Sequence, residues 1–180
     1  MYSIGVDLGG TNIAVGIVDE NYKIVKKDSC PTLANRPAEE IIRDMVALCK
    51  RLCTETGFDI TEANGVGIAC PGTVNPDTGI VEYANNIKFF DFPIVKLFSE
   101  YSGVDKANIV IGNDANLAAY GEAVAGAGKG ASSSVTITLG TGVGSGIIID
   151  GKMLTGCAHG GAEIGHTVIV KDGRQCTCGR

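Results

Sequence analysis

Residues 4–19 have the sequence IGVDLGGTNIAVGIVD. Apolar residues alternate with small or polar ones on both sides of the turn at 9–12, which predicts two antiparallel strands joined by a tight hairpin. The two glycines let the backbone approach a phosphate without interference from a Cβ, and the Thr11 hydroxyl adds a donor. The Asp7 carboxylate could orient a hydrated Mg²⁺. The hairpin is therefore a candidate phosphate-binding element, although a purely structural glycine turn explains the same residues.

A second glycine-rich stretch, residues 139–150, has the sequence LGTGVGSGIIID. Leu8 and Leu139 each precede an aspartate by 11 residues, so strand, Gly/Thr turn, strand and acidic turn recur in the same order. The glycine spacing matches neither the dinucleotide signature G-x-G-x-x-G nor the P-loop signature. Two such hairpins facing each other would hold a polyphosphate from both sides. A chance likeness between two unrelated glycine hairpins is the open alternative.

The rest of the chain mixes helix and strand signals. Spacings of three and four between apolar residues predict helices at 37–56, 92–101 and 115–125. Apolar runs predict strands at 23–27, 65–70, 108–112, 135–139 and 147–149, with residues 140–146 as a turn. We expect an α/β chain in two lobes, residues 1–118 and 119–180. The strands of the second lobe begin near residue 133, and no helix is predicted to cover their sheet, so this lobe looks incomplete.

The composition is that of an ordinary globular protein. Of 180 residues, 44% are hydrophobic and 19% are charged, and the net charge is −5. This acidic balance disfavours nucleic acid and anionic membranes as partners, so a bound phosphate would depend mainly on backbone amides and a metal ion. The chain has seven cysteines and begins with no apolar leader. With no run near the roughly 20 apolar residues that span a bilayer, we expect a cytoplasmic protein with reduced thiols.

Asn113 and Asp114 fall between a predicted strand and the helix that follows it. Either residue could simply be the N-cap of that helix. A carboxylate at the carboxyl end of a strand could instead act as a general base toward a substrate hydroxyl. Both interpretations are open from the residues alone, with Asp114 as the candidate base.

His166 is followed ten residues later by Cys176 and then by Cys178. An imidazole and two thiolates suit tetrahedral Zn²⁺, but a structural zinc site has four ligands. Cys157 is a candidate fourth ligand, although it precedes the segment Glu163–His166, whereas the other two cysteines follow it. Thiols that bind no metal would explain the same pattern.

Taken in order, these motifs resemble those of the ROK family, which comprises sugar kinases, including bacterial glucokinases, and related repressors. The resemblance covers the whole chain, and the segment from Glu163 to Gly179 is its most specific part, because the glycine hairpins are shared with the wider actin-like ATPases. The matching motifs are Asp7-x-Gly-Gly-Thr11, Cys70-Pro71-Gly72, Asn113-Asp114-Ala115-Asn116, Leu139-Gly140-Thr141-Gly142-x-Gly144-x-Gly146, Glu163-Ile164-Gly165-His166 and Cys176-x-Cys178-Gly179.

The resemblance implies a two-lobed fold of the ribonuclease H-like or actin-like type and ATP-dependent phosphorylation of a hexose, with glucose as the expected sugar. Asp114 matches the base that takes the proton from the sugar hydroxyl. The implied sugar contacts are Gly72, Asn86, Asn113, Glu163 and His166. The implied nucleotide and phosphate contacts are Asp7, Gly9, Gly10, Thr11, Asn12, Gly140, Thr141, Gly142 and Gly144, with Asp7 near Mg²⁺. His166, Cys176 and Cys178 match three ligands of a structural Zn²⁺.

Two departures from the family pattern matter. Ala162 stands where many members have glycine, and the family motif continues past Arg180 to a further cysteine, an acidic sugar contact and the adenine pocket. We therefore expect the 180-residue chain alone to phosphorylate sugar poorly or not at all. The family's repressors are the alternative, but they carry a helix-turn-helix domain before the first strand, which here begins at Tyr2. Family members are commonly dimers or tetramers, so a homo-oligomer is expected.

Overall fold

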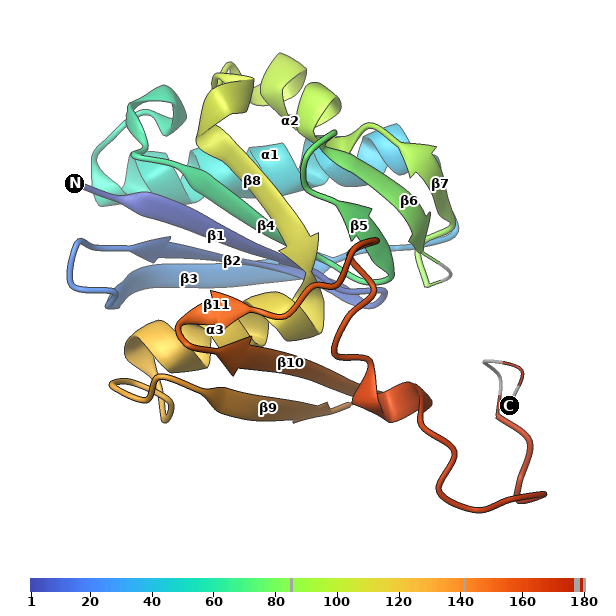
Figure 1. The fold of residues 1–180 in the computed structure, drawn as a ribbon. Coiled ribbons are helices and arrows are strands. Elements are labelled where there is room, and N and C mark those ends of the chain that lie inside the picture. The colour runs from blue at the N-terminus through green and yellow to red at the C-terminus, as the bar shows by residue number, and fades with distance from the viewer. Residues whose placement is uncertain (85, 141, 177–178, 180) are drawn as a thin grey trace. The chain divides into compact units, whose positions relative to one another are not determined.

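The computed structural model describes residues 1–84, 86–140, 142–176 and 179. The chain divides into two compact units, Met1–Asp114 and Ala115–Arg180. Figure 1 shows the elements of each unit along the chain. The lobe boundary expected at residue 118 falls inside the helix that joins the two units.

The first unit is built on a five-stranded sheet in the order β3-β2-β1-β4-β8 (Figure 1). The β1–β2 and β2–β3 pairs are antiparallel, whereas β4 pairs in parallel with β1 on one side and β8 on the other. Because β1, β4 and β8 run in the same direction, their carboxyl ends meet at one edge of the sheet. The strands are β1 (Ser3–Leu8), β2 (Asn12–Val18), β3 (Ile24–Pro31), β4 (Val66–Cys70) and β8 (Ile109–Asn113).

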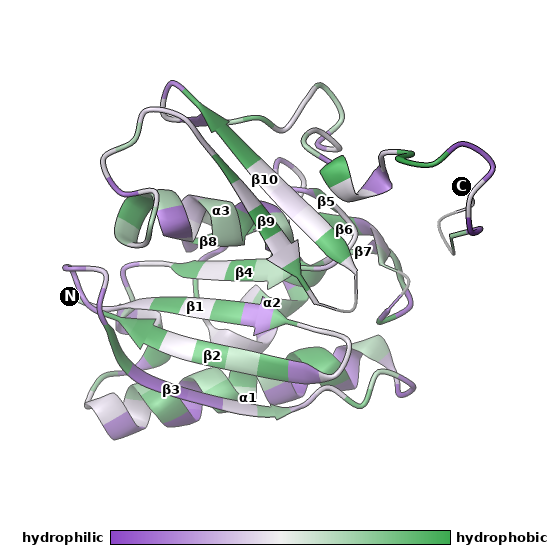
Figure 2. Cartoon of the chain, turned by 90° about the horizontal axis from the view of Figure 1, so that it is seen from below, coloured by the Kyte–Doolittle hydropathy of each residue, from purple (hydrophilic) through white to green (hydrophobic). Residues whose placement is uncertain are grey.

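The core of the first unit lies between this sheet and two helices, α1 (Ala38–Thr56) and α2 (Ile94–Ser102). Alternate residues of the strands point into it, as the banding of β1 and β2 in Figure 2 illustrates. Both helices were predicted, and α1 ends as expected at Gly57, which takes the left-handed φ of +91°. Two short 3₁₀ turns, Ile60–Glu62 and Lys106–Asn108, precede β4 and β8.

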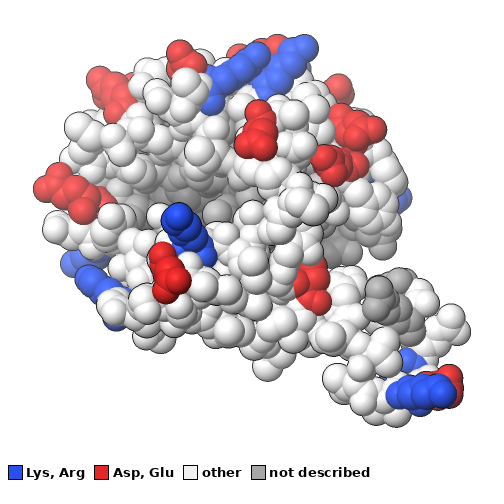
Figure 3. Space-filling view, in the orientation of Figure 1, with Lys and Arg blue, Asp and Glu red and all other residues white. Residues whose placement is uncertain are grey.

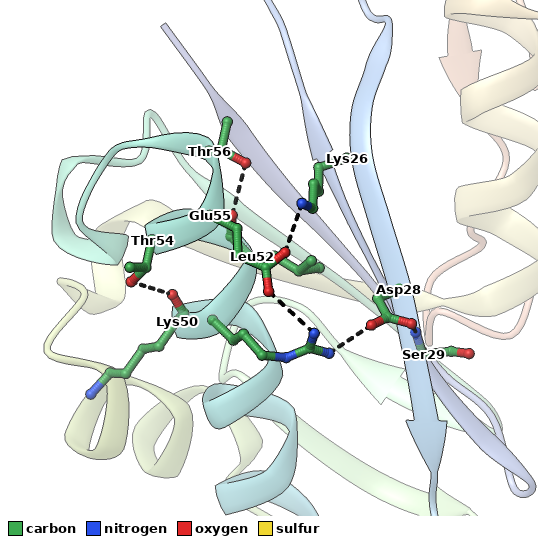
Figure 4. A network of polar contacts seen from close by, with 9 residues as sticks. Lys26, Asp28, Ser29, Lys50, Leu52, Thr54, Glu55 and Thr56 are labelled. Atoms are coloured by element: carbon green, nitrogen blue, oxygen red, sulfur yellow. Dashed lines mark hydrogen bonds and ion pairs between the residues drawn. The ribbon is translucent and has the colours of Figure 1, made fainter.

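A surface network of charges ties α1 to the edge strand β3 (Figure 4). Arg51 lies 2.7 Å from Asp28 and 3.4 Å from Glu55, and Lys26 lies 2.7 Å from the other oxygen of Glu55. These side chains are about 40 to 50% exposed, so solvent screens the attraction within each pair and the pairs contribute little to stability. The network therefore links the helix to the sheet edge and adds little to the stability of the fold.

A small antiparallel sheet, β5-β6-β7, was not predicted from the sequence. Its strands are β5 (Thr73–Asn75), β6 (Ile80–Ala84) and β7 (Phe89–Phe92). Backbone irregularities hide it: the β5–β6 register shifts between Thr73 and Val74, and Lys88 and Asp91 take positive φ values of 52° and 45°. These features break the two-residue alternation by which strands are identified.

The second unit combines α3 (Asp114–Ala125) with a three-stranded antiparallel sheet in the order β11-β10-β9. Its strands are β9 (Ser134–Leu139), β10 (Val143–Ile149) and β11 (Lys152–Met153), and a 3₁₀ turn follows at Ile164–His166. Two expectations are wrong. Residues 143–146 belong to β10 rather than to a turn, and a helix does cover this sheet. A Cβ at Gly146 would run into Ala119 of α3, and one at Gly144 would lie 2.8 Å from the Ala115 Cβ. Small residues on both elements thus bring helix and strand close together.

Within the described part of the chain, no helix is long and apolar enough to cross a membrane. On the face shown in Figure 3, Lys and Arg side chains are scattered among Asp and Glu.

Candidate active site

The first glycine turn is held in place by Thr32, which lies just after β3 and is fully buried. Its hydroxyl donates a hydrogen bond of 2.7 Å to the Gly9 carbonyl, and its N–H donates one of 2.8 Å to the Thr11 carbonyl. The turn is closed by a bond of 2.9 Å from the Gly9 N–H to the Asn12 carbonyl. Sequence reasoning missed Thr32, because nothing in the residues around it marks a contact more than 20 positions away.

Gly10 of this turn lies against Asn86, which precedes β7. A Cβ at Gly10 would lie only 3.2 Å from the Asn86 Cβ, so a side chain there would force the two loops apart. The structure therefore places a predicted sugar contact beside a predicted phosphate turn. Thr11 and Asn12, the next two residues along the chain, are exposed.

Two carboxylates share the edge where the parallel strands end. Asp7 is near the end of β1, and Asp114 directly follows β8 as the first residue of α3. Partial burial, together with the negative charge of Asp114, raises the pKa of Asp7 above its ordinary value. The Cys70 thiol at the end of β4 is fully buried, and burial, then the charges of Asp114 and Asp7, raise its pKa strongly. The thiol thus stays neutral beside a pair of acids.

Asn113 and Gly72 are brought together at the same edge. The Asn113 amide donates a hydrogen bond of 3.1 Å to the Gly72 carbonyl. Gly72 takes a φ of +85°, and a Cβ there would run into the Tyr83 carbonyl of β6. The unpredicted small sheet is therefore what requires glycine at this turn.

The second glycine turn is one residue shorter than the first. Leu139 pairs with Val143, four positions later, whereas the corresponding Leu8 pairs with Ile13, five positions later. The Gly140 N–H donates a hydrogen bond of 2.9 Å to the Gly142 carbonyl, and a Cβ at either glycine would meet open space. Gly144, by contrast, is packed within β10. Thr141 lies outside the described residues, so its predicted role stays a prediction.

Glu163 and His166 lie on one short loop of the second unit. The His166 Nε2 is 3.8 Å from a Glu163 carboxylate oxygen, and the two side chains are 56% and 42% exposed. Glu163 has φ −78° and ψ 61°, and the Ile164 N–H donates a bond of 2.9 Å to the Ala162 carbonyl. These values define an inverse γ-turn centred on Glu163.

His166 and Cys176 both line a hollow of about 780 Å³ bounded by residues Gly165–Cys176. Imidazole and thiolate are ligands that Zn²⁺ accepts, so the two side chains fit the predicted metal in kind. Cys178 lies outside the described residues. Among the residues that the structure does describe, no group of three or more metal-binding side chains is assembled. The zinc site therefore stays a prediction.

Comparison with known proteins identifies the family. The family profile described as "ROK family" matches residues 3–180. The chain belongs to the ROK family. It is 40% identical to a glucokinase from Thermotoga maritima over 98% of this chain and 53% of that protein. It is 30% identical to an N-acetylmannosamine kinase from Salmonella arizonae over 100% of this chain and 58% of that protein.

A solved ROK structure has the same fold. The ROK glucokinase from Streptomyces griseus, crystallised with glucose and AMPPNP, superposes with a TM-score of 0.86 at 38% identity, over 100% of this chain and 55% of that one. This likeness confirms the actin-like fold expected from the sequence. The chain spans about half the length of the ROK relatives that it matches.

Proposed function

We propose that the protein transfers the γ-phosphoryl group of ATP to a hydroxyl of a hexose, with glucose as the first candidate. One observation carries the proposal: Asp7 and Asp114 lie at the edge where the parallel strands β1 and β8 end, and the Gly9–Asn12 turn directly follows β1. A base, a second carboxylate and a glycine turn that lets the backbone approach a phosphate are parts that phosphoryl transfer uses. The likeness to glucokinases over the whole of this chain supports the same reaction.

In this proposal Asp114 accepts the proton of the sugar hydroxyl, and the hydroxyl oxygen attacks the γ-phosphorus of ATP. The bond from that phosphorus to the bridging oxygen breaks, and ADP leaves. A positioned base of this kind contributes about 10²- to 10⁴-fold in rate. Asn113, held by its bond to the Gly72 carbonyl, would orient the hydroxyl toward Asp114. In the second unit, Glu163 and His166 would bind other hydroxyls of the sugar.

The backbone N–H groups of the two glycine turns would bind phosphate oxygens, through Gly9, Gly10, Thr11 and Asn12 in one unit and Gly140, Thr141 and Gly142 in the other. Asp7 would hold Mg²⁺, since carboxylate oxygen is the ligand this ion prefers and its charge would relieve the repulsion from Asp114. When bound, Mg²⁺ neutralises charge on the transferring phosphate.

His166, Cys176 and Cys178 would hold a structural Zn²⁺ and so orient the loop that carries Glu163. We also propose that the protein acts as a dimer or tetramer. The nearest experimental test of the function is a sugar panel. Purified protein, in the form its gene encodes, is assayed for ADP release with glucose, mannose, fructose, N-acetylglucosamine and N-acetylmannosamine. Sugar-dependent ADP release supports the proposal, and its absence with every sugar contradicts it.

A further inference from the structure

A buried serine bridges the two ends of the turn that carries Glu163. Ser145 lies in β10 and is only 3% exposed. Its Oγ accepts a hydrogen bond of 2.9 Å from the Ile164 N–H and donates one to the Ala162 carbonyl. These two groups are also bonded to each other across Glu163. One hydroxyl therefore clamps the whole inverse γ-turn.

Two further features constrain the residues on either side of Glu163. Ala162 takes a φ of +67°, the left-handed region that favours glycine and is unfavourable for residues with a Cβ. A Cβ at Gly165 would run into the Val143 carbonyl of β10. The residues flanking Glu163 are therefore constrained in two ways: Gly165 packs closely on β10, and Ala162 has a strained backbone. The Ser145 hydroxyl bonds to the backbone of the same turn.

The position of Ser145 within its strand gives the clamp a role. β10 begins at Val143, directly after the second glycine turn. Gly144 and Gly146, on either side of Ser145 in this strand, face α3. Ser145 points to the opposite face, toward the Glu163 loop. A single short strand thus joins the proposed phosphate turn to the proposed sugar loop.

We propose that Ser145 is a positioning residue for sugar recognition, which fixes Glu163, and with it His166, relative to the glycine turn at the start of β10. This inference rests on the proposed function. Ser145 itself would touch neither sugar nor nucleotide. Its effect should therefore appear in the KM for sugar and not in the KM for ATP.

The test compares Ser145→Ala with Ser133→Ala. Ser133 is exposed at the other end of the hairpin, where its hydroxyl accepts one bond of 3.1 Å from the Asp150 N–H. Loss of the buried hydroxyl should raise the sugar KM about tenfold while leaving the KM for ATP within about twofold. Ser133→Ala should change neither value.

A second substitution separates positioning from general stability. Without the clamp, Ala162 can relax out of its strained φ, and Glu163 moves with it. Glycine adopts that φ without strain, so Ala162→Gly added to Ser145→Ala should recover part of the lost sugar affinity. An unchanged sugar KM in Ser145→Ala, an equal rise in both KM values, or no recovery in the double variant would each overturn the inference.

Hydrogen exchange distinguishes failure of the Ser145 inference from failure of the proposed kinase function. The Ile164 amide should exchange about tenfold faster or more in Ser145→Ala than in the wild type or in Ser133→Ala. If the wild-type protein phosphorylates no sugar, the proposed function fails, and the clamp is judged by this exchange alone. Faster exchange confined to Ser145→Ala then supports the clamp, and unchanged exchange overturns it.

Discussion

The Asn113 side chain donates a hydrogen bond to the carbonyl oxygen of Gly72, 41 residues earlier in the chain. The bond joins the end of β8 to the turn after β4, two neighbouring strands of the sheet. Gly72 takes a left-handed φ of +85°, and a Cβ there would run into the Tyr83 carbonyl of β6. The orientation of a proposed sugar contact thus depends on a strand that makes no contact with sugar in our proposal.

Replacing Gly72 with alanine should therefore lower both stability and sugar affinity. The left-handed φ alone costs a residue with a Cβ about 1–2 kcal/mol, and the collision with β6 adds to this. Gly57 is the matched control, because it has a φ of +91° and open space around its Cβ position. Urea unfolding should show a larger loss for Gly72→Ala than for Gly57→Ala. Equal losses would mean that the approach of Tyr83 has no energetic consequence.

Asp7→Asn should stabilise the protein at neutral pH. Because the pKa of Asp7 is raised, the folded state binds its proton more tightly than the unfolded chain does, between the ordinary value of 3.8 and the raised one. Stability from this group therefore falls as pH rises through that window and stays reduced above it. Asparagine carries no charge at any pH, so the Tm at pH 7 should rise.

Asp19→Asn is the control with the opposite sign. Backbone hydrogen bonds from Lys23 and Asn21 lower the pKa of Asp19, so its charge stabilises the fold above the ordinary pKa, and this substitution should lower the Tm at pH 7. Mg²⁺ should raise the Tm of the wild type more than that of Asp7→Asn. Thermal scans at pH 4 and 7 with and without Mg²⁺ measure both effects, and an unstable Asp7→Asn would contradict the account.

The glycines of the second hairpin should separate into two groups. Gly146→Ala pushes a methyl group into Ala119 and the backbone of α3, and overpacking of this kind costs about 1–3 kcal/mol. Gly142→Ala meets open space, so its stability should stay within about 0.5 kcal/mol of the wild type while the KM for ATP rises. Unfolding curves and nucleotide titrations check the pair. A stable Gly146→Ala would show that α3 does not need this close approach.

Zn²⁺ should protect Cys176 from a thiol reagent and leave the reactivity of Cys157 unchanged. Cys157 and Cys176 are both exposed, so both should react with a thiol reagent in the native protein. Burial raises the pKa of Cys53 to about 11 and that of Cys49 further, so these thiols should stay unreacted until unfolding. Added Zn²⁺ should slow Cys176 and leave Cys157 unchanged, as mapped by mass spectrometry of the labelled peptides. Slowing of Cys157 as well would make it a ligand, and no effect on Cys176 would remove the proposed site.

Periodicity was sufficient for the large sheet and helices of the first unit, but not for its small β5-β6-β7 sheet. The alternation of residues 4–18, the helical spacing of 37–56 and the glycine stop at Gly57 correspond to β1, β2 and α1. The two hairpins were also predicted, but not the register of the second. Residues 140–146 were expected to form a turn because they are rich in glycine, whereas Gly144 and Gly146 are in a strand that packs closely on α3. Glycine signals a close approach, and the sequence does not say whether a ligand or a helix is approaching.

Long-range contacts supplied what local pattern could not. Thr32 supports the first glycine turn, Tyr83 requires Gly72, and Ser145 clamps the Glu163 loop. Each of these residues is more than ten positions away in sequence from the group that it contacts. None of them lies in a sequence motif that would predict the contact. Ala162 was noticed as a departure from glycine, and its positive φ explains why glycine suits that position.

The central claim is that Asp114 is the base for phosphorylation of a hexose. Asp114→Asn removes the base but keeps the size of the side chain. Asp150→Asn is the matched control, since Asp150 sits exposed in the β10–β11 turn with a φ of +48° that asparagine tolerates well. The decisive measurement is turnover and glucose affinity of both variants, by coupled ADP release and calorimetry. We expect Asp114→Asn to bind glucose with nearly wild-type affinity and to lose about 10²- to 10⁴-fold in turnover, while Asp150→Asn keeps both. Near-normal turnover by Asp114→Asn would contradict the account.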